Sequence, residues 1–182
     1  KDINGQPVRD CFSTPKSVVD VLLNYLPGVK NEFVWDPACG DGCIINACRT
    51  FGITNVGGAD LFVPFETMGE TDFLTHGVHS DTTLTIINPP FSQMKQFLIK
   101  MLEVKTKSAI LMSSSAIYTQ YFKDFFSVQK DICLLHVGGK YNFINEEGAA
   151  VDIGHVVWVI IGYGFPQFSA DIVHISNTNP PS

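Results

Sequence analysis

Apolar residues recur along the chain with two different spacings. Between residues 15 and 26 Val and Leu return every three or four positions, which places them on one face of a helix. Ser13 or Thr14 is expected to cap that helix, and Pro15 is expected in its first turn. Later apolar runs are short and unbroken, as in buried strands. The chain is therefore predicted to open with a helix and to continue as alternating strands and helices.

The remaining elements follow from the same patterns. Short apolar runs predict strands at residues 32–35, 54–60, 83–87, 108–115, 132–137 and 155–163. Helical spacing predicts helices at residues 43–51, 92–103 and 116–126, with a short element near residues 72–74. A polar, glycine-containing stretch without helical spacing separates the last two strands, which suggests an antiparallel hairpin at the C-terminal end. The predicted fold class is α/β, with a mainly parallel, doubly wound sheet.

Size and hydrophobicity are those of an ordinary globular domain. The chain has 182 residues, of which 45% are hydrophobic, so we expect a single domain over residues 1–182. No leader segment is apparent at the start, and the apolar runs fall short of the roughly 20 residues that cross a bilayer. We therefore expect a soluble intracellular (cytoplasmic) protein with no membrane partner.

The distribution of charge gives little support for a nucleic-acid surface, and the cysteines and histidines give little support for a metal site. The net charge of −6 argues against nucleic-acid binding, although residues 95–140 carry seven lysines and only three acidic residues. Solvated helix faces account for those lysines at least as well as a binding patch does. Five cysteines without a C-x-x-C pair predict reduced thiols, and His76 and His79 have no convincing companion ligand. No metal is inferred.

The heptapeptide DPACGDG, residues 36–42, follows the first predicted strand and precedes a helix. Gly40 and Gly42 stand where a backbone must turn tightly and approach a ligand. The loop has neither the Lys-Ser/Thr of a phosphate loop nor the spacing of a dinucleotide fingerprint. Asp36 instead favours a ligand with an ammonium group, although a helix cap would also explain an aspartate there.

Two further carboxylates fall at intervals that extend this ligand. Asp60 ends the second predicted strand, where a carboxylate can accept both hydroxyls of a ribose. Asp72 and the adjacent Phe73 could hold the amino edge of an adenine and stack on its ring. An amino-acid end, a ribose and an adenine together describe S-adenosylmethionine. A turn residue at Asp60 and a solvated carboxylate at Asp72 are the simpler alternatives.

The tetrapeptide NPPF begins directly after the apolar strand at residues 83–87. Pro89 and Pro90 end any regular element, because each lacks a backbone N–H and has a fixed φ. Asn88 and Phe91 are thereby presented at the carboxyl end of a strand, where doubly wound sheets bind ligands. A plain turn that ends a buried strand is the alternative.

Three segments together resemble a known family, the S-adenosylmethionine-dependent amino-methyltransferases that act on adenine in DNA. DPACGDG resembles the family's cofactor loop, NPPF its catalytic tetrapeptide, and CFSTPKSVVDVLL from Cys11 its N-terminal Phe-x-Thr-Pro segment. The resemblance covers roughly residues 10–165 and implies a Rossmann-like class I methyltransferase fold with S-adenosylmethionine as cofactor. The implied cofactor contacts are Phe12, Thr14, Pro15, Asp36, Ala38, Gly40, Gly42, Asp60, Asp72, Phe73 and Asn88.

The resemblance also implies the catalytic residues, which are Asn88, Pro89, Pro90 and Phe91. The Asn88 side-chain oxygen and the Pro89 carbonyl would accept the two N–H groups of the target amine and direct its lone pair at the methyl group. The ring of Phe91 would stack on a base taken out of its helix. No strong general base is needed, because positioning supplies most of the rate.

Target recognition is the part of the family pattern for which the chain offers no segment. No separate recognition domain is expected, so DNA recognition would come from loops or from a separate specificity subunit, unless the substrate is not duplex DNA. Methylation of RNA adenine or of a protein glutamine, and a scaffold role without activity, stay open. In the closing hairpin Phe143, His155 and Trp158 could line a base pocket, with core packing favoured for Trp158. Aromatic residues between 118 and 126 are expected in the core.

Overall fold

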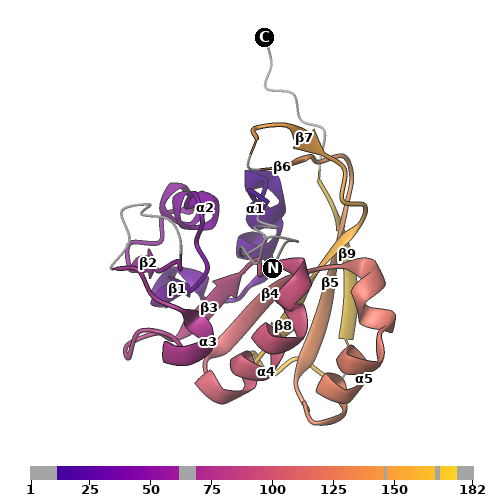
Figure 1. Ribbon diagram of the computed structural model, residues 1–182. Helices are drawn as coiled ribbons and strands as arrows, with labels where there is room; N and C mark the ends of the chain where they lie inside the picture. The colour runs from indigo at the N-terminus through magenta and orange to yellow at the C-terminus, as the bar shows by residue number, and fades with distance from the viewer. Residues whose placement is uncertain (1–11, 62–68, 146, 167–168, 176–182) are drawn as a thin grey trace, which may run out of the picture.

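A seven-stranded sheet forms the centre of the computed structural model, and helices cover both of its faces (Figure 1). The structure describes residues 12–61, 69–145, 147–166 and 169–175. Cys11, which begins the N-terminal segment that the sequence singled out, lies outside them. No helix in the described part of the chain has the length and apolar character needed to cross a membrane.

Helices and strands alternate through the first three quarters of the chain. The α-helices are α1 (Lys16–Tyr25), α2 (Cys43–Phe51), α3 (Phe73–His76), α4 (Met94–Val104) and α5 (Gln120–Ser127). Short 3-10 helices are η1 (Val29–Asn31), η2 (Phe91–Gln93) and η3 (Ser114–Tyr118). The strands are β1 (Val34–Asp36), β2 (Val56–Gly58), β3 (Leu84–Ile87), β4 (Lys107–Ser113), β5 (Ile132–Gly138), β6 (Phe143–Ile144), β7 (Ala150–Val151), β8 (Val156–Ile161) and β9 (Ser169–His174).

The order of strands in the sheet is β2-β1-β3-β4-β8-β5-β9. Strands β2, β1, β3 and β4 are parallel to one another, whereas β8 lies between β4 and β5 and is antiparallel to both. The small β6–β7 pair forms a separate antiparallel sheet in the connection between β5 and β8. The predicted α/β class, with a mainly parallel sheet and an antiparallel C-terminal hairpin, is therefore confirmed.

Strand β9 was not predicted. It pairs in parallel with β5 at the edge of the sheet, and most of its residues are exposed, with Ile172 67% exposed. An edge strand with little buried surface needs no strict alternation of apolar and polar residues, which is the signal that sequence patterns detect. Its position is set by backbone pairing with β5.

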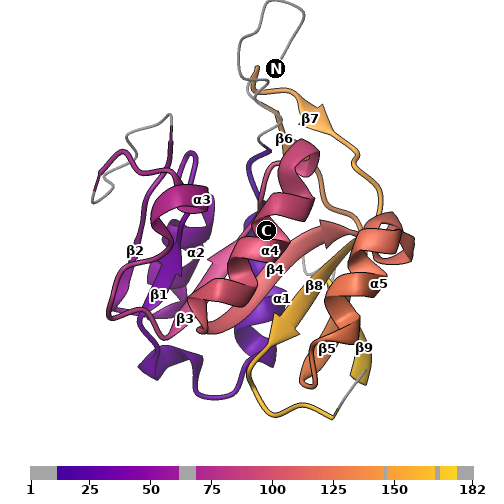
Figure 2. The ribbon, with the colours of Figure 1, turned by 60° about the horizontal axis from the view of Figure 1, so that its bottom comes forward.

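Each face of the sheet carries one buried apolar cluster. Helices α1 and α2 pack on one face, where Leu22 and Ile44 meet sheet residues such as Leu84. Helices α4 and α5 pack on the other, where Phe122 meets Ile110. Figure 2 shows α4 and α5 in front of the sheet with α1 behind it. The strands are hydrophobic on both sides because both sides are covered.

Two helix predictions need correction. Pro15 is the N-cap of α1, and neither Ser13 nor Thr14 caps the helix, because both side chains bond elsewhere. The helix predicted at residues 116–126 is split into η3 and α5, since Thr119 between them has an extended backbone (φ −80°, ψ 155°). The helix predicted at residues 43–51 is confirmed as α2.

Candidate functional site

A cavity of about 460 Å³ opens at the carboxyl ends of β1, β2 and β3. The loops that follow β1, β2 and β3 meet there, because these three strands are parallel neighbours in the sheet and end at the same edge. The lining residues are Phe12, Thr14, Asp36, Pro37, Ala38, Cys39, Asp41, Cys43, Ile44, Asp60, Leu61, Thr71, Asp72, Phe73, Leu74, Asn88, Pro90, Ser92, Gln93 and Phe97.

The glycine loop, residues 36–42, begins at the last residue of β1 and is held against the end of β2. The Cys39 N–H donates to the Ala59 carbonyl at 3.0 Å, and Gly40 and Gly42 both have left-handed backbones, with φ of 49° and 79°. Such conformations favour glycine because a side chain would clash with the following carbonyl. At Gly58 a Cβ atom would lie 2.5 Å from the Asp36 carbonyl oxygen. Backbone conformation therefore favours glycine at positions 40 and 42, and close packing requires it at position 58.

Asp36 is the most deeply buried carboxyl group of the cavity wall, at 1% exposed. Its Oδ1 accepts a hydrogen bond from the Ala38 N–H at 3.2 Å. Burial raises the pKa of Asp36 to about 8, and the nearby carboxylates of Asp60 and Asp41 add to that rise. A cation bound in the cavity would stabilise the ionised form and lower this pKa again.

Two other predicted carboxylates line the same cavity but serve different local structures. Asp60 Oδ2 accepts the Gly40 N–H at 2.9 Å, which joins the ends of β1 and β2. Asp72 is the N-cap of α3 and accepts the Leu74 N–H at 2.9 Å. Asp72, and not Asp36, is therefore the aspartate of this cavity that caps a helix.

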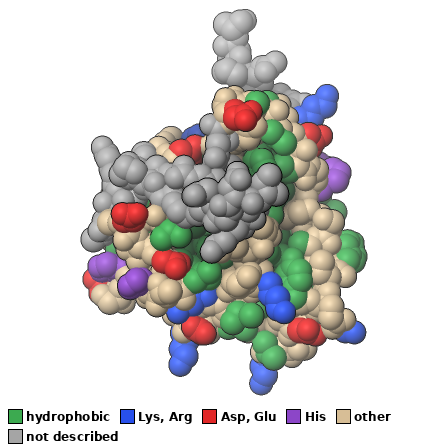
Figure 3. Space-filling model, in the orientation of Figure 1, with side chains coloured by type: hydrophobic (Ala, Val, Ile, Leu, Met, Phe, Trp, Pro, Cys, Tyr) green, Lys and Arg blue, Asp and Glu red, His purple; other side chains and the backbone are tan. Residues whose placement is uncertain are grey.

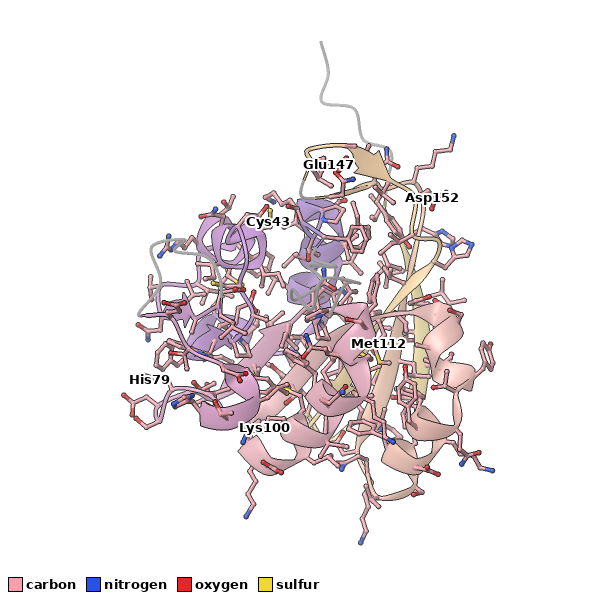
Figure 4. All side chains as sticks on the ribbon, viewed as in Figure 1. Cys43, His79, Lys100, Met112, Glu147 and Asp152 are labelled. Carbon is pink, nitrogen blue, oxygen red and sulfur yellow. The ribbon has the colours of Figure 1, made fainter. Side chains whose placement is uncertain are left out.

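Two thiols, Cys39 and Cys43, also face the cavity. Burial raises the pKa of each to about 12, and the neighbouring carboxylates of Asp36 and Asp41, respectively, raise it further. Figure 4 shows Cys43 at the start of α2. The thiolate is the reactive form of cysteine, so these protonated thiols are poor nucleophiles at neutral pH.

Asn88 follows β3 directly and reaches across to the N-terminal segment. Its Nδ2 donates to the Phe12 carbonyl and to Thr14 Oγ1, both at 3.0 Å. Its Oδ1 is shielded from solvent and has no hydrogen-bond partner. A buried amide oxygen without a donor is costly, and such an atom in a wall of a cavity is a natural acceptor for a ligand N–H.

The predicted site residues divide into two groups. Those that line the cavity are Phe12, Thr14, Asp36, Ala38, Asp60, Asp72, Phe73, Asn88 and Pro90. Those outside its lining are Pro15, Gly40, Gly42, Pro89 and Phe91. The ring of Phe91 instead packs on that of Phe12, with centroids 5.6 Å apart, and Phe73 also packs on Phe97 at 5.4 Å.

Several lining residues were not singled out from the sequence. Asp41 lies within the glycine loop, and Ser92 and Gln93 follow the NPPF tetrapeptide directly, so their chain positions were the available signal. Phe97 belongs to the buried face of α4, and its apolar spacing resembles that of any core residue. Only the packing of α4 against α3, where Phe97 meets Phe73, brings it to the cavity.

Other predicted positions lie away from the cavity lining. Phe143 and Trp158 are fully buried, and Trp158 Nε1 donates to the Val18 carbonyl at 3.0 Å, so both belong to the core. Tyr118, which was expected in the core, is 86% exposed. His79 packs on Trp35 with ring centroids 5.5 Å apart. Figure 4 shows His79 far from Glu147 and Asp152 of the β6–β7 region.

Lysine side chains do not gather in one place on the visible face. Figure 3 shows basic side chains dispersed along the lower part of the molecule, with acidic side chains between them. Lys100, for example, pairs with Glu103 one turn along α4 at 3.0 Å. On this face the basic side chains therefore do not form a single binding patch.

Comparisons with known proteins support the fold. No family model matches the chain, and no curated protein matches it by sequence. A Listeria monocytogenes protein described as a class I S-adenosylmethionine-dependent methyltransferase is similar in structure, with a TM-score of 0.67 and 14% identity over 98% of this chain and 70% of its own. A Pyrococcus horikoshii protein described as an RNA methyltransferase gives a TM-score of 0.60 and 15% identity, over 86% and 90% of the two chains.

A third solved structure comes from a restriction system. The M protein of the type I restriction enzyme EcoKI gives a TM-score of 0.52 and 15% identity over 88% of this chain, which spans 47% of the M protein. At these identities the similarity establishes the fold alone. The chain has a Rossmann-like class I methyltransferase fold, as predicted.

Proposed function

We propose that this chain is an S-adenosylmethionine-dependent N-methyltransferase that acts on the N6 amino group of adenine in DNA. The observation that carries the proposal is Asn88, whose Oδ1 is an unpartnered acceptor beside an acidic cavity. The class I methyltransferase fold and the order of the N-terminal, glycine-loop and NPPF segments support it.

The cavity wall suits a cationic cofactor with an amino-acid end, a ribose and a base. Its aspartates, Asp36, Asp41, Asp60 and Asp72, supply hydrogen-bond acceptors, and a bound cation would favour the ionised form of Asp36. Asp36 would receive the ammonium group, Asp60 the ribose hydroxyls, and Asp72 with Phe73 the adenine. The left-handed glycines Gly40 and Gly42 keep the loop compact beside it. When bound, S-adenosylmethionine supplies a methyl group activated by a sulfonium.

Asn88 would act by binding the target amine in a reactive geometry. An exocyclic amine is a weak nucleophile because its lone pair is delocalised into the ring. Acceptors on its two hydrogens, Asn88 Oδ1 and the Pro89 carbonyl, would favour a pyramidal nitrogen and aim its lone pair at the methyl group. Cys39 and Cys43 take no covalent part, because their thiols stay protonated.

DNA is the proposed substrate because of the NPPF tetrapeptide and the fold shared with a restriction-enzyme M protein. A second restriction-modification enzyme, LlaGI, was solved with a DNA substrate mimic and gives a TM-score of 0.56 at 12% identity, where this chain spans 28% of it. The dispersed lysines offer little phosphate neutralisation on the face shown in Figure 3. We therefore propose that loops or a separate specificity subunit supply target recognition.

The experiment that tests the proposal has two stages. Calorimetry first measures binding of S-adenosylmethionine, which we expect to be lost or strongly weakened in Asp36→Ala. Radiolabelled methyl transfer is then measured to unmethylated duplex DNA, single-stranded DNA and RNA, followed by nucleoside analysis. N6-methyladenine in DNA is the expected product. Methyl transfer to RNA alone or to a protein amide would overturn the substrate, and no cofactor binding would overturn the whole proposal.

A further inference from the structure

The side-chain amide of Asn88 is held in one orientation by the N-terminal segment. Its nitrogen lies 3.0 Å from the Phe12 carbonyl oxygen and 3.0 Å from Thr14 Oγ1. A carbonyl oxygen can only accept hydrogen bonds, so the atom that faces Phe12 must be the nitrogen. A flipped amide would place two acceptor oxygens against each other. The Oδ1 atom therefore points away from residues 12–14.

The segment that holds Asn88 is itself fixed from two sides. The Ser13 N–H donates to the Ile144 carbonyl at 2.8 Å, which pairs the segment with β6. The Ser13 hydroxyl donates to Asp41 of the glycine loop. Residues 12–14 thus connect the β6–β7 pair and the glycine loop to the residue that follows β3. A segment anchored at both neighbours is a rigid support for a side chain.

Thr14 contacts Asn88 through its side chain, whereas Phe12 contacts it through a backbone carbonyl, so a substitution can remove the Thr14 contact alone. Thr14 is 4% exposed, and its hydroxyl oxygen accepts one of the two Asn88 N–H groups. The resemblance to adenine methyltransferases assigns Thr14 to the cofactor. The observed contact assigns it a different partner, because its hydroxyl bonds to a side chain of the NPPF tetrapeptide.

We infer that Thr14 is a positioning residue for methyl transfer, which together with the Phe12 carbonyl orients Asn88 so that Oδ1 is left for the target amine. The inference rests on the proposed function of Asn88. It predicts that loss of the Thr14 hydroxyl lowers the rate of transfer and leaves cofactor affinity nearly unchanged.

The kinetic test compares Thr14→Val, which keeps the shape and removes the acceptor, with Thr14→Ser, which keeps the acceptor. We expect Thr14→Val to lower kcat by roughly threefold to tenfold, the value of a single hydrogen bond, with the cofactor Kd changed by less than about twofold. Thr14→Ser should recover most of the lost kcat. A weaker cofactor Kd with unchanged kcat, or a Thr14→Ser rate as low as that of Thr14→Val, would overturn the inference.

Thr85→Val provides the matched control for stability. Thr85 is also fully buried in β3, and its hydroxyl bonds to that of Thr106 at 2.8 Å, away from the cavity. We expect this variant to lose thermal stability to a similar degree as Thr14→Val while its kcat stays near that of the wild type. An equal loss of kcat in both variants would mean that general destabilisation explains the Thr14 effect.

A second measurement does not depend on activity. In the wild type, the two side-chain N–H protons of Asn88, assigned by their disappearance in Asn88→Asp, should both exchange with solvent more slowly than those of exposed amides. Thr14→Val should release one of them. If both protons exchange rapidly in the wild type, the inference is wrong even where methyl transfer is found. If they are protected but no substrate is methylated, the orientation of Asn88 stands and the proposed function fails.

Discussion

The Gly40 N–H donates a hydrogen bond to Asp60 Oδ2 at 2.9 Å, which joins the loop after β1 to the end of β2. One carboxylate thus supports the glycine loop and also lines the cavity. Asp60 thus has a structural contact and a proposed ligand contact. Two substitutions distinguish the contribution of its charge from that of its acceptor oxygen.

Asp60→Asn keeps an oxygen for Gly40 but removes the charge, whereas Asp60→Ala removes both. We expect the cofactor Kd to rise by roughly tenfold or more in Asp60→Ala, which has no acceptor for the ribose hydroxyls. The rise should be smaller in Asp60→Asn, which keeps an acceptor oxygen but forms weaker hydrogen bonds than a charged carboxylate does. Calorimetry with S-adenosylmethionine measures both. Wild-type affinity in Asp60→Ala would exclude Asp60 from the cofactor site.

Asn88→Ala removes the proposed acceptor for the target amine. We expect kcat to fall by roughly a hundredfold or more, as for other preorganised groups that act on the reacting atoms, with the cofactor Kd within about threefold of the wild type. Asn24→Ala is the matched control, since Asn24 is an exposed asparagine whose Nδ2 donates to the Asp20 carbonyl at 2.8 Å. Full transfer activity in Asn88→Ala would refute the mechanism.

Cofactor binding is expected to depend on pH through Asp36. Burial raises the pKa of this carboxyl group to about 8, so it is mostly protonated at neutral pH before a cation binds. An ammonium group favours the ionised form, and binding then releases a proton. Affinity should therefore rise by up to about tenfold per pH unit up to pH 8 and level off above it. Calorimetry between pH 6 and 9 measures this slope, and a flat profile would exclude Asp36 as the ammonium partner.

The same raised pKa predicts how stability changes with pH. In the unfolded chain Asp36 ionises near its ordinary value of 3.8, whereas in the folded chain it ionises near 8. Between these values the unfolded state binds fewer protons at Asp36, so the contribution of Asp36 to the free energy of unfolding falls as pH rises and is constant above about pH 8. Asp36→Asn cannot ionise, so its free energy of unfolding should not fall in this way and should exceed that of the wild type by roughly 2–5 kcal/mol at pH 8.

Denaturant titrations at pH 5 and pH 8 test the stability prediction. The exposed Asp81→Asn variant is the control, because its carboxyl group lies at the surface. We expect Asp81→Asn to follow the wild type at both values of pH. If the advantage of Asp36→Asn is the same at pH 5 and pH 8, the buried ionisation of Asp36 is not its cause.

Gly58→Ala tests the close contact between β2 and the glycine loop. A Cβ atom at this position would lie 2.5 Å from the Asp36 carbonyl oxygen, which belongs to the backbone and cannot rotate away. We expect a loss of roughly 1–3 kcal/mol in unfolding free energy, seen as a lower Tm, together with weaker cofactor binding as the loop shifts. An unchanged Tm and Kd would show that the loop tolerates the displacement.

Much of the fold could be predicted from local patterns. The apolar faces of α1 and α2 have regular helical spacing, and the buried runs of β3, β4, β5 and β8 are apolar on both sides. Their physical cause is local, since each buried face must be apolar wherever it packs. The edge strand β9 and the uncapped start of α1 were missed, because they depend on contacts with residues distant in sequence. The break at Thr119 was also missed, because the apolar spacing continues across it.

By itself the sequence determined which chemical groups stand at the ends of which strands: Asp36 at the end of β1, Asp60 after β2, and Asn88 after β3. Parallel strands end at the same edge of the sheet, so that order alone predicts a common site. Only the tertiary structure decided that Asp36 is buried enough to hold a proton near neutral pH, and which way the Asn88 amide points. Burial and amide orientation are set by atoms brought together from distant segments, so no local pattern of residues encodes them.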